Sequence, residues 1–251
     1  MTTALAIAAL PLGAIIGSFL NVVIHRLPLG QSLATPGSHC PACQTPIKPY
    51  DNVPLLSWVV LRGRCRHCGE QISARYPLVE VVTAVAFAGV VLARGADAEL
   101  WALIPFTAML VAVAGIDLDH RIVPNKILLP AAIWGVVTAV AFRPDMLVEL
   151  LAAGAGAFTF LLLAALAYPA GMGMGDVKLA GVMGLYLGAA VIPALFVAFV
   201  AGSLVGMVTI AREGAGARKK GVPFAPFLAL GGLVGVIAGP ELVDLYVDNF
   251  L

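Results

Sequence analysis

The chain has 251 residues, of which 61% are hydrophobic and only 12% are charged, and its formal net charge is +1. Soluble proteins average roughly 45–50% apolar and 25% charged residues, so this composition excludes an ordinary soluble domain and predicts an integral membrane protein. The sequence contains no basic field of the kind that binds nucleic acid, and we expect no nucleic-acid partner.

Apolar runs of about 17 or more residues recur along the chain, and each is long enough to cross a bilayer as a helix. Between residues 179 and 211 there is no charged residue, which is too long for one span and predicts a hairpin that turns near Gly188 to Pro193. The sequence therefore predicts an all-α polytopic membrane protein with about eight transmembrane helices. The remaining predicted spans are residues 4–24, 77–93, 100–116, 127–142, 146–169 and 223–239, the last followed by an acidic tail.

The distribution of Lys and Arg predicts the orientation of these spans, because cytoplasmic loops carry an excess of cations. If the large polar segment 26–76 is cytoplasmic, only Arg94 and Arg143 lie outside, and the other thirteen cations lie inside, several of them in the basic loop from Arg212 to Lys220. Both chain termini are then expected outside.

All four cysteines lie in the polar segment 26–76, as the pairs Cys40–Cys43 and Cys65–Cys68. Two C-x2-C pairs separated by 21 residues fit a tetrahedral four-thiolate zinc site, and such a closed site is structural rather than catalytic. Two disulfides are the alternative, but a reducing cytoplasmic location favours zinc. Zinc binding would supply much of the folding energy of so small a segment.

Two carboxylates are the candidate catalytic groups. Asp176 lies in the glycine-rich stretch Gly171–Leu179, whose alternating glycines allow a second backbone or a peptide substrate to approach it closely. Asp117 lies at the cytoplasmic end of the third predicted span, at the same depth, whereas Asp119 faces elsewhere, because positions two apart on a helix point in different directions. The alternative is that these acids only cap helix ends, or relay protons in a membrane transporter.

Two carboxyls that converge on one site share a proton, because both cannot ionise cheaply. An aspartyl protease needs this arrangement: the ionised carboxylate takes a proton from water while the neutral one polarises the scissile carbonyl. A proton-coupled transporter would be expected to carry acids or broken helices near the bilayer midplane and an internal repeat, and the sequence has neither. A non-catalytic zinc scaffold would leave the pair of acids on one side of the membrane unexplained.

Several motifs, in order along nearly the whole chain, resemble those of the bacterial prepilin leader peptidases. They are Gly17-Ser18-Phe19-Leu20-Asn21 with Arg26-Leu27-Pro28, the two cysteine pairs, Arg75-Tyr76-Pro77-Leu78-Val79-Glu80, Ile116-Asp117 with Pro124, Gly173-Met174-Gly175-Asp176-Val177-Lys178, and Pro223-Phe224-Ala225-Pro226-Phe227. Members of that family are membrane aspartyl proteases of the G-x-G-D type, with eight helices. They remove the basic leader of type IV prepilins and pseudopilins at the cytoplasmic face, and many then methylate the new N-terminus with S-adenosylmethionine.

The resemblance implies that Asp117 and Asp176 are catalytic, that the four cysteines bind structural Zn2+, and that S-adenosylmethionine is the methyl donor. It also implies a multi-pass location in the bacterial inner membrane, with prepilins or pseudopilins and membrane lipid as partners. Residues 1–25 would form the first span, 26–76 a zinc domain associated with methyl transfer, and 77–251 the protease domain.

Further site residues are predicted around these groups. Gly173, Gly175 and Lys178 would form a loop that the substrate approaches. Asn21, Arg26 and Glu80 are candidates for contact with the substrate or the methyl donor, although Asn21 would serve equally as a helix-packing amide and Glu80 could reach the membrane interface.

The chain departs from the family pattern at Asn125. The stretch Val123-Pro124-Asn125 stands where many members have Leu-Pro-Asp, which leaves an amide in place of an acid.

Overall fold

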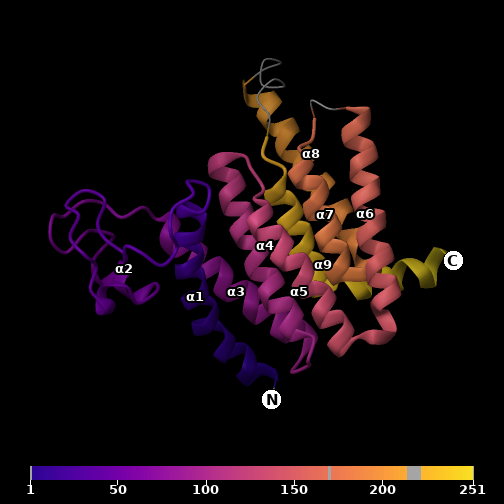
Figure 1. Cartoon of the computed structure of the whole chain (residues 1–251), viewed down its shortest axis with the longest axis horizontal. Helices are drawn as coiled ribbons and strands as arrows, with labels where there is room; N and C mark the ends of the chain where they lie inside the picture. Colours follow the sequence, from indigo (N-terminus) through magenta and orange to yellow (C-terminus); the bar gives the residue numbers. More distant parts are fainter. Residues whose placement is uncertain (1, 169–170, 214–221, 251) are drawn as a thin grey trace. The chain divides into compact units, whose positions relative to one another are not determined.

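The computed structural model describes residues 2–168, 171–213 and 222–250. Apart from two isolated β-bridges, the regular structure in these residues is helical, and the chain divides into two compact units, residues 1–92 and 93–251 (Figure 1). Most of the basic loop predicted at Arg212–Lys220 lies outside the described residues, which end at Glu213 and resume at Val222.

The first unit contains α1 (Thr2–Arg26), the short helices η1 (Pro49–Asp51) and α2 (Leu56–Val60), and most of α3 (Arg75–Arg94). Helices α1 and α3 pack backbone to backbone through glycines four residues apart on α1. A Cβ atom added at Gly13 would lie 2.6 Å from the Cα of Ala84, and one added at Gly17 would lie 2.8 Å from the Cα of Glu80. Small residues at this spacing let membrane helices approach closely.

The second unit contains the remaining long helices. They are α4 (Leu100–His120), α5 (Asn125–Phe142), α6 (Leu147–Ala167), α7 (Met174–Leu187), α8 (Val191–Glu213) and α9 (Ala225–Phe250), with the short helices η2 (Pro144–Met146) and η3 (Gly188–Ala190) before α6 and α8. The predicted hairpin in residues 179–211 is therefore present, and its turn is η3.

Helix α7 lies at the centre of this unit and packs against all the other long helices, α4, α5, α6, α8 and α9. Nine of its fourteen residues are buried. It packs most closely on α6, where a Cβ added at Gly184 would lie 2.5 Å from the carbonyl oxygen of Ala153. On another side, the ring of Tyr186 stacks on Phe106 of α4, with centroids 4.4 Å apart.

Seven stretches of the described residues are long and apolar enough to cross a membrane. One of them, Met174–Glu213, has 40 residues and comprises α7, η3 and α8, so the predicted number of about eight spans requires these two helices to be counted separately. Seven apolar stretches confirm the prediction of a multi-pass membrane protein.

The predicted end of the last span at residue 239 is wrong, because α9 continues through Pro240 to Phe250. A proline has no N–H, so the carbonyl of Val236, four residues earlier, loses its partner within the helix. The guanidinium Nε of Arg94 donates a hydrogen bond to that carbonyl at 2.8 Å and replaces the missing donor. Figure 1 shows the final part of α9 bending away from the rest of the helix.

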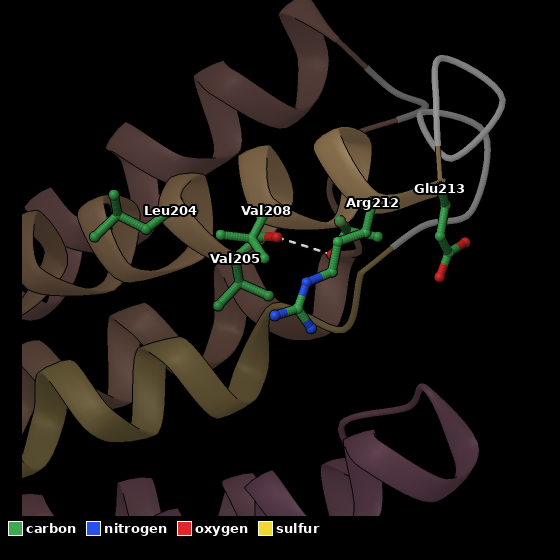
Figure 2. A pocket seen from close by; sticks show the side chains of 6 residues that line it. Leu204, Val205, Val208, Arg212 and Glu213 are labelled. Atoms are coloured by element: carbon green, nitrogen blue, oxygen red, sulfur yellow. Dashed lines mark hydrogen bonds between the residues drawn. The ribbon is translucent and has the colours of Figure 1, made fainter.

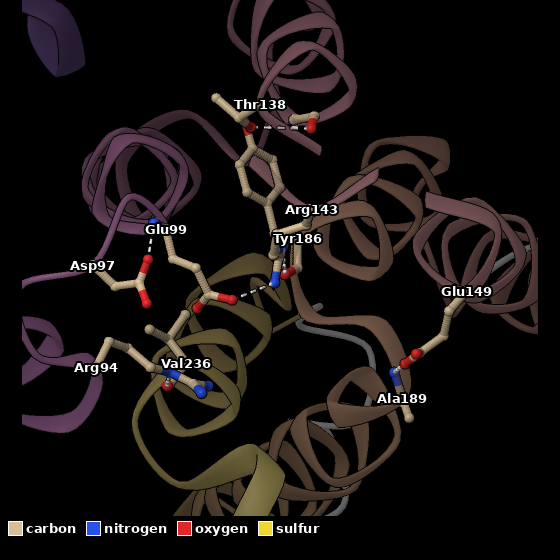
Figure 3. Close-up of polar contacts among 10 residues, drawn as sticks. Arg94, Asp97, Glu99, Thr138, Arg143, Glu149, Tyr186, Ala189 and Val236 are labelled. Carbon is tan, nitrogen blue, oxygen red and sulfur yellow. Dashed lines mark hydrogen bonds and ion pairs between the residues drawn. The ribbon is translucent and has the colours of Figure 1, made fainter. Parts of the chain in front are cut away.

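Arg143, the second cation predicted outside, also donates to a helix carbonyl (Figure 3). Its guanidinium donates to the carbonyl of Tyr186 near the end of α7, at 3.1 Å, and forms a 3.2 Å ion pair with Glu99 at the start of α4. Nearby, the carboxylate of Glu149 accepts the backbone N–H of Ala189 at 3.1 Å. These contacts connect α4, α5, α6 and α7 at the end of the unit opposite to Asp117 and Asp176.

Candidate active site and metal centre

Asp117 lies in the last turn of α4 and is 5% exposed. The helix ends directly after this turn because Arg121 adopts a left-handed conformation, with φ 53°, and its N–H bonds to the Asp117 carbonyl at 2.9 Å. The Asp117 carboxylate accepts a 3.1 Å hydrogen bond from the backbone N–H of Ala225, the first residue of α9. The helix end and this donor together fix where the carboxylate lies.

Asp176 is the third residue of α7 and is 8% exposed. The N-cap position belongs to Gly173, whose carbonyl accepts the backbone N–H of Asp176 at 3.1 Å. Asp176 is therefore not itself the N-cap of α7, and the carboxylate lies within the first turn. The two acids lie at the same end of the second unit, because Gly175, next to Asp176, packs against Val123, which follows the end of α4 that carries Asp117.

The packing of α7 on α6 shows how far Asp176 lies from the end of α6. Position 184 lies against residue 153 and position 181 against residue 158, which defines an antiparallel register between the two helices. Continued at 1.5 Å per residue, this register places Asp176 level with Leu162, about 8 Å below the end of α6 at Ala167. Asp176 thus lies below the end of α6.

The glycines around Asp176 have different surroundings. A Cβ added at Gly175 would lie only 2.7 Å from the Cβ of Val123, in the segment between α4 and α5. A Cβ added at Gly173 would make only ordinary contacts, at 3.6 Å from the Asp176 carboxylate and 3.9 Å from the backbone nitrogen of Gly175. The predicted close approach of a second chain segment therefore occurs at Gly175, and that segment is the protein's own.

Lys178 and Asn125 form a direct contact that the sequence analysis did not predict. The ammonium of Lys178 donates to the side-chain oxygen of Asn125 at 3.1 Å, and this bond connects α7 to the first residue of α5. The amide that departs from the family pattern is therefore a hydrogen-bond acceptor beside the site. Asp119, in contrast, is exposed, as its helix position predicts.

The four cysteines form two equivalent knuckles. In each, the N–H of the residue after the second cysteine bonds to the carbonyl of the first cysteine: Gln44 to Cys40 at 2.9 Å and Gly69 to Cys65 at 3.0 Å. Gln44 and Gly69 both have positive φ, at 58° and 75°. The sequence spacing thus produces the same tight turn twice.

The two knuckles bring all four sulfur atoms within 4.8 Å of one another. The Sγ atoms of Cys40 and Cys68 are 3.7 Å apart, close to the separation of about 3.8 Å that Zn–S bonds of 2.3 Å impose in a tetrahedron. A disulfide requires about 2.05 Å, and the cysteines are free. The donor set and its dimensions therefore fit zinc and not the disulfide alternative.

The surroundings of the thiols shift their pKa values in different directions. Hydrogen bonds from the hydroxyl and then the backbone of Thr45 lower the pKa of Cys43 to about 6. Backbone N–H groups of Cys68 and His67 lower the pKa of Cys65. Although the N–H of Glu70 favours its thiolate, burial and the three neighbouring thiols raise the pKa of Cys68 to about 12. Four thiolates at this spacing need a cation between them.

The three further residues predicted near the substrate or the methyl donor all make contacts within the first unit. The amide of Asn21 donates to the carbonyl of Tyr76 at 3.1 Å, which is the helix-packing role. Glu80 is 7% exposed and accepts the N–H of Leu55 at 2.8 Å. Arg26 donates to two carbonyls of the following loop, those of Ser32 at 3.1 Å and Pro36 at 2.8 Å. These residues hold the polar segment on α1 and α3.

A pocket of about 390 Å³ lies elsewhere, along α8 (Figure 2). Its lining consists of Leu204, Val205, Val208, Thr209, Arg212 and Glu213. Neither acid nor Lys178 contributes to it, so this pocket is not the site described above.

The fold is that of a polytopic helical membrane protein, and it carries a four-thiol cluster and two buried carboxyls. These are the features that the sequence analysis predicted for a membrane aspartyl protease. The comparisons specify the family. Residues 12–94 match the bacterial peptidase A24 N-terminal domain, and residues 104–209 match the type IV leader peptidase family. The chain therefore belongs to the type IV leader peptidase family.

Full-length relatives agree with this assignment. The chain is 36% identical to a prepilin leader peptidase/N-methyltransferase of Aeromonas hydrophila, over 94% of this chain and 91% of the relative. It is 32% identical to the protein of that name in Bacillus subtilis, over 95% and 96%. No solved structure matches the chain. The predicted family and peptidase class are confirmed, and none of these relatives supports the transporter alternative.

Proposed function

We propose that this protein is a membrane aspartyl endopeptidase that removes the leader of type IV prepilins or pseudopilins, with Asp117 and Asp176 as the catalytic pair. The observation that carries this assignment is the burial of both carboxyls at the same end of the second unit, where Gly175 packs against Val123 in the segment that follows α4. The names of the full-length relatives support the substrate class.

The chemistry requires one proton shared by the pair. The ionised carboxylate takes a proton from water as the water oxygen attacks the scissile carbonyl carbon, and the neutral carboxyl gives its proton to the carbonyl oxygen. The resulting diol collapses when the first carboxyl protonates the leaving amide nitrogen and the second recovers its proton. The pair returns to its starting state.

The depth of the acids suits a substrate with an apolar helix and a polar leader. Such a substrate can place its helix in the bilayer and its leader in the cytoplasm, so the scissile bond is held near the membrane boundary. In this proposal the boundary lies at the level of Asp176, about 8 Å below the end of α6. Position along the membrane normal would then select the bond that is cut.

Cys40, Cys43, Cys65 and Cys68 would hold a structural Zn2+ that organises residues 26–76. The names of the relatives support a second activity, N-methylation of the newly exposed terminus, for which bound S-adenosylmethionine would supply the methyl group. The expected location is the bacterial inner membrane, with the cysteine segment cytoplasmic and both termini outside.

Cleavage of a purified prepilin by the reconstituted protein tests the catalytic assignment. Asp117→Asn and Asp176→Asn should each lower the cleavage rate by about 10²–10⁴-fold, because each removes one proton-transfer group. Asp119→Asn is the matched control, since Asp119 is exposed and should leave the rate nearly unchanged. Equal losses in all three variants would contradict the pairing of Asp117 with Asp176.

The metal assignment has an independent measurement. The purified protein should contain one zinc ion per chain by elemental mass spectrometry, and Cys65→Ser should lose it, because three thiolates leave the tetrahedral site open. Methylation with a labelled donor, measured on a prepilin already cleaved, would show whether the same variant also loses the second activity. A full zinc content in Cys65→Ser would refute the four-thiolate site.

A further inference from the structure

The short helix α2 exposes an apolar stripe on an otherwise polar segment. Leu56, Val59 and Val60 are 65%, 66% and 72% exposed, and their spacing of three and four residues places them on one face. The opposite face packs inward, where Ser57 is buried and the indole of Trp58 donates to the carbonyl of Ile72 at 3.2 Å. A stripe of this kind usually indicates an interaction surface.

A hydrogen bond attaches α2 to the first turns of α3, a helix long and apolar enough to cross a membrane. The N–H of Leu55, the residue before α2, donates to the buried carboxylate of Glu80 at 2.8 Å. Glu80 lies five residues into the membrane-spanning helix α3, which begins at Arg75, and five residues correspond to about 8 Å. Interfacial helices bury their apolar faces to a similar depth, about 5–10 Å.

Glu80, which accepts the hydrogen bond from Leu55, is itself held against α1 by Gly17. Gly17 packs against the Cα of Glu80, so the carboxylate that holds Leu55 is part of the close α1–α3 contact. Helix α2 is therefore connected to the membrane-spanning part of its own unit through a short and buried chain of contacts.

Cations follow the stripe directly. Arg62 and Arg64 are both exposed, and the chain reaches them through a turn at Arg62 and Gly63, which have φ values of 53° and 67°. A Cβ at Gly63 would lie 3.0 Å from the ring of Trp58, so the turn packs tightly on α2. Apolar residues followed by exposed arginines complement a bilayer surface that contains anionic phospholipid.

We propose that α2 is an interfacial anchor whose residues Leu56, Val59 and Val60 insert between the headgroups and acyl chains of the bilayer, with Arg62 and Arg64 at the lipid phosphates. The occupant is the phospholipid of the membrane that α1 and α3 cross. The contact itself does not depend on the proposed peptidase activity. Only its assignment to the cytoplasmic leaflet follows from the proposed topology.

Depth-dependent fluorescence quenching in the full-length, reconstituted protein tests this contact. A genetically encoded fluorescent amino acid would replace Val59, or Glu70 as an exposed acidic control in the second cysteine knuckle. In bilayers containing brominated phospholipid and an anionic lipid, the probe at position 59 should be quenched several-fold more than the probe at position 70. Equal quenching at the two positions would overturn the proposal.

Two further measurements separate lipid from other occupants. In the Arg62→Gln/Arg64→Gln variant, quenching at position 59 should fall in anionic bilayers to the level seen in zwitterionic ones, and an unchanged value would overturn the role of the arginines. A photo-crosslinking amino acid at position 59 should label lipid. Labelling of a second copy or of another segment of the chain instead would overturn lipid as the occupant, and zinc content would verify that each variant is folded.

Discussion

Substitution of Gly175 by alanine should disturb the candidate active site without adding a charge or a polar group. The new Cβ would lie 2.7 Å from the Cβ and 3.1 Å from the Cγ2 of Val123. Carbon atoms in contact are normally about 3.5–4.0 Å apart, so the two segments must separate by roughly 0.8 Å or more. Val123 cannot yield easily, because it precedes Pro124, which has a restricted backbone.

The displacement falls next to Asp176. Overpacking of this size costs about 1–3 kcal/mol of stability, and a misplacement of about 1 Å in a catalytic group can lower a rate by about 10²-fold. We therefore expect Gly175→Ala to lower both the melting temperature and the prepilin cleavage rate. The assays are thermal unfolding in detergent and cleavage of a purified prepilin in liposomes.

Gly173→Ala is the matched control, because its Cβ would come no closer than an ordinary 3.6 Å to any neighbouring atom and the native φ of −81° suits alanine. Its cleavage rate should stay near that of the unsubstituted protein. A full rate in Gly175→Ala would refute the steric reasoning. A large loss in Gly173→Ala with unchanged stability would instead indicate that the substrate peptide needs the space beside Asp176.

Two predictions concern the membrane helices. Arg94→Met should lower the free energy of unfolding by about 1–3 kcal/mol, because it leaves the Val236 carbonyl without a donor. The same substitution made together with Pro240→Ala should lower the free energy of unfolding much less, since the restored backbone N–H of residue 240 replaces the guanidinium. Thermal unfolding of the two single variants and the double variant measures this, and additive effects would contradict it. Gly17→Ala should also destabilise the protein, by about 1–3 kcal/mol from overpacking. Gly206→Ala is the control and should leave stability unchanged, because a Cβ there would meet nothing within 4 Å. Equal melting temperatures for the Gly17→Ala and Gly206→Ala variants would contradict the packing of α1 on α3.

Hydropathy was sufficient to predict the helices and the turn at Gly188, because bilayer thickness constrains the length of each apolar run. It placed the end of the last helix wrongly, since Pro240 normally stops a helix and only a distant guanidinium, that of Arg94, replaces the lost donor. The expectation that Gly173, Gly175 and Lys178 form a loop around Asp176 is wrong for Gly175 and Lys178, which lie with Asp176 in α7. Asp176 lies inside the first turn of this helix because Gly173 serves as the N-cap.

The site itself was predictable only where side chains carry the signal. The spacing of the cysteines indicated their cluster, and the burial of Asp117 and Asp176 followed from two carboxylates at the ends of apolar runs. The donor from Ala225 could not be predicted from its residue type, because every residue except proline has an N–H. The surrounding motif, Pro223 to Phe227, was the only indication that this segment matters.

The recess of Asp176 below the end of α6 also constrains the conformation of any peptide that is cut there. An amide inside an intact α-helix has its carbonyl engaged by the N–H four residues later and is shielded by neighbouring side chains. A substrate that enters the bilayer as a helix must therefore unravel for several residues before its carbonyl can reach both carboxyls. Sequences with glycine or another weak helix former at the junction would unravel at the lowest energetic cost, so the ease of local melting would contribute to the choice of substrate.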